Sequence, residues 1–128
     1  MLRYLSDPTT AALEKALQGQ ALRQRAVANN IANVDTPGYS PQRVRFESEL
    51  QAALAADPED AIETTDRIGR LQPQEQREGI SLRRDGNGVD IEREMVELAE
   101  SSLQHRVLVR LLSKKLQMLK NVATEGGR

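Results

Sequence analysis

The sequence contains no cysteine and no tryptophan, and aromatic residues make up only 2% of it. Without cysteine, disulfides, thiolate metal sites and a cysteine nucleophile are excluded. With so few aromatic side chains, apolar packing must come from Leu, Val, Ile, Met and Ala. Such a composition suits exposed helices with apolar stripes, or a segment that becomes ordered only on assembly, better than a large compact core.

Charge of one sign and long apolar runs are also missing. The net charge is −1, so the chain has no overall field that would attract nucleic acid. The first 20 residues lack the continuous apolar region of a classical secretory signal. No apolar run approaches the roughly 20 residues that span a bilayer. At 128 residues, one domain or one elongated subunit is expected.

Motifs that carry chemistry are absent as well. The sequence has no phosphate-binding glycine loop, paired-carboxylate motif or metal-ligand cluster. Its single histidine, His105, would need a nucleophile or carboxylate partner for catalysis, and a packing role is the simpler interpretation. A calcium loop over residues 83–94 would place Arg83 where a carboxylate is required. We therefore expect no enzyme activity, no cofactor and no bound metal.

Helical periodicity is present near the N-terminus. Asp7 and Pro8 are typical of a helix start, since Asp caps the first turn and Pro lacks an N–H that would be unpaired there. The pattern predicts a helix over about residues 8–33. The apolar members of its heptad frame are Leu13, Leu17, Val27, Ile31 and Val34.

A stronger pattern fills the C-terminal third, where Asp90 is the expected N-cap. Steps of four and three residues predict a heptad seam. Its members are Ile91, Met95, Leu98, Ser102, His105, Val109, Leu112, Leu116 and Leu119. A second apolar row consists of Val96, Leu103, Val107, Leu111 and Met118. One partner helix would not cover both rows, so association with several neighbours is expected.

These patterns predict a mainly α, elongated fold with long N- and C-terminal helices. We divide it into an N-terminal core helix (1–34), a middle region (35–89) and a C-terminal heptad helix (90–128). A short amphipathic helix is expected over residues 46–57 and a loop over 64–79. Residues 80–84 alternate briefly and predict an extended segment, and "DGNG" at 85–88 predicts a turn.

The stretch "ANNIANVDTPGY", residues 28–39, closes the first helix. Thr36 is kept out of the α region by the proline that follows it, and Pro37-Gly38 suits a type II turn. That accounts for a helix stop but not for asparagines at 29, 30 and 33. Their amides can donate and accept across a crowded helix end, which suits contacts between packed chains.

The same stretch resembles the signature of the bacterial flagellar axial proteins, the rod and hook subunits, where it closes the N-terminal helix. Residues 85–120 resemble the last segment of the proximal rod members of that family. The resemblance implies that the N- and C-terminal helices pair as a coiled coil. It also implies a structural subunit of the basal-body rod that self-assembles into a helical tube and transmits torque. The residues that it implies for assembly are Asn30, Ile31, Asn33, Thr36, Pro37 and Gly38.

The resemblance also implies partners and a location. The subunit would be made in the cytoplasm, leave through the flagellar type III export gate and lie in the periplasmic rod. Phe46 and Leu50 resemble a short export-gate motif. Implied partners are copies of the chain, other rod proteins and a small adaptor protein at the inner-membrane ring, with no nucleic acid or small-molecule substrate. The residues alone leave open a free-standing coiled-coil adaptor or regulator.

Overall fold

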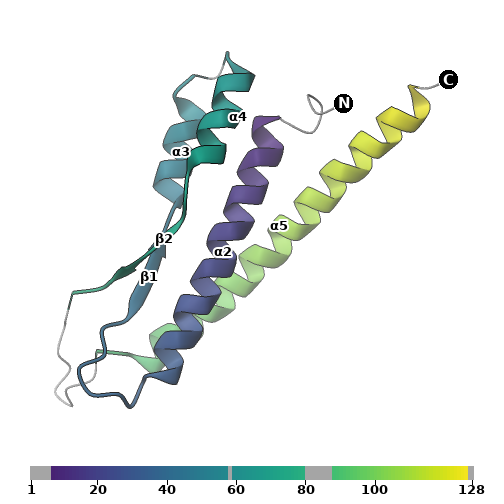
Figure 1. Cartoon of the computed structure of the whole chain (residues 1–128). Coiled ribbons are helices and arrows are strands. Elements are labelled where there is room, and N and C mark those ends of the chain that lie inside the picture. The colour runs from purple at the N-terminus through teal and green to yellow at the C-terminus, as the bar shows by residue number, and fades with distance from the viewer. Residues whose placement is uncertain (1–6, 58, 80–87, 127–128) are drawn as a thin grey trace.

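The computed structural model describes residues 7–57, 59–79 and 88–126. The order of elements is α2 (Pro8–Ala32), β1 (Gln42–Arg45), α3 (Glu47–Ala55), α4 (Ala61–Arg70), β2 (Gln74–Arg77) and α5 (Ile91–Glu125). Figure 1 shows α2 in the middle, with α5 on one side and the α3–α4 arm on the other. The long helices run in opposite directions and diverge toward the chain ends. The expectation of a mainly α fold with long terminal helices is confirmed.

The caps expected at both long helices are present. Asp7 Oδ1 accepts a hydrogen bond from the Thr10 N–H at 2.5 Å, and α2 ends at Ala32, close to the predicted boundary. Asp90 accepts from the N–H groups of Glu92 and Arg93 at 3.1 and 3.4 Å. These carboxylates satisfy N–H groups that the first helical turn leaves unpaired.

The prediction of a loop over residues 64–79 is wrong, because α4 and β2 occupy most of it. Asp60 caps α4 by accepting from the Glu63 N–H at 2.9 Å, and ion pairs one turn apart support the helix. Only Thr64 and Ile68 are buried on α4, and most of its residues are polar. The predicted extended segment at 80–84 lies outside the described residues, as do residues 85–87 of the predicted turn.

A two-stranded antiparallel ribbon joins the helical parts. Gln42 of β1 lies opposite Arg77 of β2, and Val44 lies opposite Glu75. All four residues of β2 are exposed and none is apolar. Its extended form therefore comes from pairing with β1 rather than from its own sequence, which is why periodicity did not reveal it.

The apolar core lies where the ribbon enters α3. Phe46 is 5% exposed and packs with Ala26 and Val44. Its ring lies directly on Gly19, where a Cβ would overlap the ring atoms. The guanidinium of Arg23, a residue of α2, lies 5.0 Å from the centroid of this ring. The only phenylalanine of the chain thus fixes the α3–α4 arm against α2.

The face of α5 that contacts α2 is rotated from the predicted seam. Glu94 and Ser101 are buried there, and Leu98, His105, Leu108, Leu112 and Leu119 are half-buried. The seam residues Ile91, Met95, Val109 and Leu116 remain exposed in the single chain. On α2, Val27 is buried, and Leu13, Leu17 and Ile31 are half-buried.

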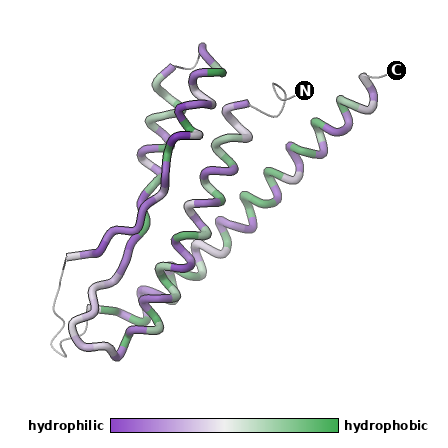
Figure 2. Tube along the Cα trace, viewed as in Figure 1, coloured by the Kyte–Doolittle hydropathy of each residue, from purple (hydrophilic) through white to green (hydrophobic). Residues whose placement is uncertain are grey.

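Polar contacts explain this rotation. Ser101 Oγ donates to Gln20 Oε1 at 2.7 Å, and Asn30 Nδ2 donates to Glu94 Oε2 at 3.0 Å. A buried polar group left without a partner costs free energy, so these bonds turn Glu94 and Ser101 toward α2. The predicted pairing of Val109 and Leu116 with α2 is therefore not the arrangement within one chain. Figure 2 shows apolar positions recurring along α5 to its C-terminal end.

Candidate assembly site at the end of α2

The side chain of Asn30 pairs with β1 as a neighbouring strand would. Its Nδ2 donates to the Gln42 carbonyl at 2.9 Å, and its Oδ1 accepts from the Gln42 N–H at 2.8 Å. Nδ2 also donates to Glu94, and the Tyr39 hydroxyl donates to Oδ1 at 3.4 Å. The residue is 0% exposed. An amide makes about four hydrogen bonds at most, so this side chain is fully used within the chain.

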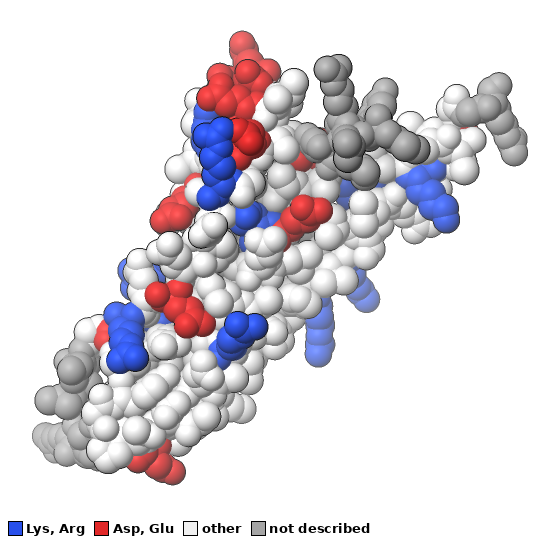
Figure 3. Space-filling model, in the orientation of Figure 1, with Lys and Arg blue, Asp and Glu red and all other residues white. Residues whose placement is uncertain are grey.

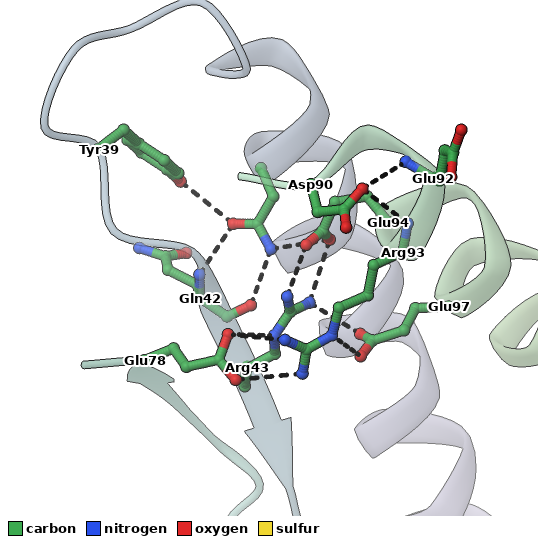
Figure 4. Close-up of polar contacts among 10 residues, drawn as sticks. Tyr39, Gln42, Arg43, Glu78, Asp90, Glu92, Arg93, Glu94 and Glu97 are labelled. Atoms are coloured by element: carbon green, nitrogen blue, oxygen red, sulfur yellow. Dashed lines mark hydrogen bonds and ion pairs between the residues drawn. The ribbon is translucent and has the colours of Figure 1, made fainter. Parts of the chain in front are cut away.

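Glu94 and Arg43 form a buried ion pair beside Asn30 (Figure 4). Arg43 Nη2 donates to Glu94 Oε1 at 2.6 Å, and Nη1 donates to Oε2 at 3.1 Å. Glu94 is 0% exposed. The parallel bonds are the bidentate geometry in which Arg–carboxylate pairs are strongest. The pair links β1 to the first turns of α5.

An outer layer of charges surrounds this pair. Arg43 Nη1 donates to Glu97 Oε2 at 2.9 Å, and its Nε donates to Glu78 Oε2 at 3.1 Å. Arg93 Nη2 donates to Glu78 Oε1 at 3.1 Å. We call Asn30, Arg43, Glu78, Glu94 and Glu97 the polar clamp. It holds α2, β1, α5 and the residue after β2 together.

Two groups of the clamp, Arg43 and Glu78, have pKa values shifted from their ordinary ones. Burial acts to lower the pKa of Arg43, but the hydrogen bond and charge of Glu94, with the charge of Glu97, outweigh it and raise that pKa. Burial acts to raise the pKa of Glu78, but Arg43 and Arg93 outweigh it and hold that pKa below its ordinary 4.5. Both shifts favour the ionised forms of Arg43 and Glu78. The carboxylates of the clamp all accept from arginines, which suits holding segments together rather than acid–base chemistry.

The predicted turn after α2 has the expected form. Gly38 has φ +75°, and the Tyr39 N–H donates to the Thr36 carbonyl at 3.3 Å, as in a type II turn. Asn33 caps α2, with its Nδ2 donating to the Asn29 carbonyl at 2.8 Å and its Oδ1 accepting from the Thr36 hydroxyl at 3.1 Å. Thr36, Pro37 and Gly38 are exposed, and Ile31 and Asn33 are half-buried.

The remaining predicted site residues lie apart from the clamp. Phe46 is in the core, with Leu50 half-buried against it. His105 is half-buried on the inner face of α5. Within the described ranges, no group of His, Cys, Asp or Glu is placed to hold a metal ion. No helix built from those residues is long and apolar enough to cross a membrane.

The sequence patterns did not identify Arg43, Glu78, Glu94 or Glu97 as site residues. One signal was available for Glu94, because it lies one helical turn before Leu98 and thus on the inner face of α5. A charge at such a position indicates a buried partner. Nothing local identified that partner, because Arg43 is 51 residues away in the chain.

Known proteins are similar to this chain along most of its length. A family model for the flagella basal body rod protein matches residues 12–39, which hold most of α2 and the Pro37-Gly38 turn. The flagellar basal body rod protein FlgB of Bacillus subtilis is 33% identical, over 95% of this chain and 98% of its own. FlgB of Escherichia coli is 32% identical over 94% and 98%. FlgB of Borrelia hermsii is 36% identical over 65% and 71%.

The lowered pKa of Glu78 predicts a loss of stability in acid. A carboxyl with a lower pKa in the folded state contributes stability above its unfolded pKa, near 4.5, and loses it as the pH falls through the folded value. The free energy of unfolding, measured with urea, should fall as the pH decreases from 5.5 to 3. The fall should be smaller in Glu78→Gln than in the matched exposed variant Glu75→Gln. Equal pH profiles in the two variants would contradict the assignment.

Proposed function

Because the chain belongs to the FlgB family of flagellar basal-body rod proteins, we propose that copies of it assemble through their two long helices. The protein is a structural subunit of the bacterial flagellar basal-body rod, and it acts together with other rod components. Family membership replaces the alternative of a free-standing coiled-coil adaptor or regulator. Each copy must reach the rod and then pack against its neighbours there.

The observation that carries the assembly proposal is the apolar surface that one chain leaves uncovered. Val96, Leu103, Val107, Leu111 and Met118 are all exposed on α5, as are four residues of the predicted seam. An exposed apolar surface of this extent marks an interaction site. Neighbouring subunits in a tube would cover both rows. In this proposal the segments 1–34 and 90–128, which contain α2 and α5, form the core, and residues 35–89 form a connecting region.

The polar clamp and the turn have separate roles in this proposal. Since the amide of Asn30 is fully used, it shapes the chain where α2 ends rather than contacting a neighbour. The exposed Thr36, Pro37 and Gly38 are better placed for contacts between subunits. A tube joined in this way would transmit torque by packing. A small adaptor protein would join it to the inner-membrane ring.

Export places a second demand on the chain. Phe46 and Leu50, the proposed export-gate motif, are packed against α2 in the folded subunit. A gate could read that motif only before the arm folds, which fits passage of an unfolded chain through the type III apparatus.

Leu112→Asp is expected to abolish motility. Leu112 is half-buried on the inner face of α5, and an aspartate there would bring an unpaired charge into the packed helices. In a strain that lacks the native gene, the variant should be made at normal levels but be missing from purified basal bodies. Asn121→Asp, at an exposed position of the same helix, should swim normally. A motile Leu112→Asp strain would contradict the assignment of Leu112 to the packed seam of α5.

Phe46→Ala should lower the amount of subunit exported, measured by fractionation of cells and medium. The control is Gly19→Ala, which displaces Phe46 from its place in the folded chain but leaves the motif intact. It should be exported normally. Equal export of Phe46→Ala and wild type would contradict the assignment of Phe46 and Leu50 as an export-gate motif.

A further inference from the structure

Two helix faces remain without a partner in the single chain. On α5, Val96, Leu103 and Val107 are 57%, 63% and 49% exposed. A helix turns by about 100° per residue, so Val96 and Leu103 point roughly away from the inner face marked by Glu94 and Ser101. Arg110 continues this line, one heptad after Leu103. We call these four residues the outer row of α5.

On α2, six of the eight exposed residues also follow steps of four and three. They are Glu14, Gln18, Ala21, Arg25, Ala28 and Ala32, which we call the outer face of α2. Steps of this kind are those of a helix face that packs along another helix. The alanines make the face thin and allow the close approach of a large side chain.

The register within the chain shows which residues share a level. Asn30 of α2 contacts Glu94 of α5, and Gln20 of α2 contacts Gln104 of α5. The second contact lies ten residues earlier on α2 and ten residues later on α5. Continuing this antiparallel register, Ala28 is level with Val96, Ala21 with Leu103, and Glu14 with Arg110. Arg25 is level with Ala99, one residue before Glu100.

We propose that the outer row of α5 packs on the outer face of α2 of a second copy, in the same orientation and the same register. Leu103 then lies on Ala21 of that copy, and Val96 lies on Ala28. Arg110 lies opposite Glu14, and Glu100 lies near Arg25. This inference rests on the proposed function, because it names the faces through which rod subunits meet.

Charge favours this register, because it brings Arg110 opposite Glu14 and Glu100 near Arg25. An inverted copy with Glu14 level with Glu100 would instead bring Arg25 beside Arg110. Both pairs have like charges, and like charges across an interface disfavour the wrong pairing. In the view of Figure 3, acidic atoms gather toward the α3–α4 end, and uncharged residues cover much of the body formed by the long helices. Each copy offers both faces, so the contact is heterologous and repeats from subunit to subunit.

Charge exchange tests the contact in a strain that lacks the native gene. Glu14→Arg and Arg110→Glu should each lower the number of basal bodies that contain the subunit by about tenfold, because each places like charges together. The double variant should restore that number to within about twofold of wild type. The matched control is Glu49→Arg, an exposed charge on α3, which should assemble normally. Failure of the double variant to recover would overturn the proposed register.

Disulfide trapping gives a second test, since the chain has no cysteine. In basal bodies treated with an oxidant, the double variant Ala21→Cys/Leu103→Cys should give a ladder of disulfide-linked subunits on a non-reducing gel. Ala21→Cys with Val122→Cys, whose positions are not level, should give none. If basal bodies contain the first variant without a ladder, the contact is wrong but the rod function stands. If the wild-type chain itself is missing from basal bodies, the proposed function fails.

Discussion

The buried pair of Arg43 and Glu94, joined to Asn30, is the interaction on which the rest of the structure depends. Taking two charges out of water is costly, and only close geometry with further hydrogen bonds offsets that cost. Here Glu94 accepts from both Arg43 and Asn30, and Asn30 also satisfies the backbone of Gln42. The cluster therefore fixes where α2 ends, where β1 lies and how α5 is rotated.

That rotation has a functional consequence. Because polar residues occupy part of the inner face of α5, large apolar side chains remain exposed in the single chain, and in the proposed assembly neighbouring subunits would cover them. A rod protein benefits from such an arrangement, since assembly then supplies the burial that one chain lacks. The only phenylalanine anchors the α3–α4 arm independently of this, through Gly19.

The parts predictable from sequence were those that depend on local chemistry. Asp7, Pro8 and Asp90 marked the helix starts, and Pro37-Gly38 marked the turn, because caps and turns involve only nearby residues. The inner face of α5 and the strand β2 could not be predicted in the same way. The face depends on Arg43, far away in the chain, and β2 depends on its partner strand, so neither follows from periodicity.

A double-mutant cycle in urea tests the central claim most directly. Asn30→Ala and Arg43→Met remove different partners of Glu94, so their effects on the free energy of unfolding should be coupled. If the three residues form one cluster, the coupling between Asn30→Ala and Arg43→Met in the free energy of unfolding should be about 1 kcal/mol or more. Effects that add to within about 0.5 kcal/mol would mean that Asn30 and Arg43 act independently, and that no shared cluster sets the fold.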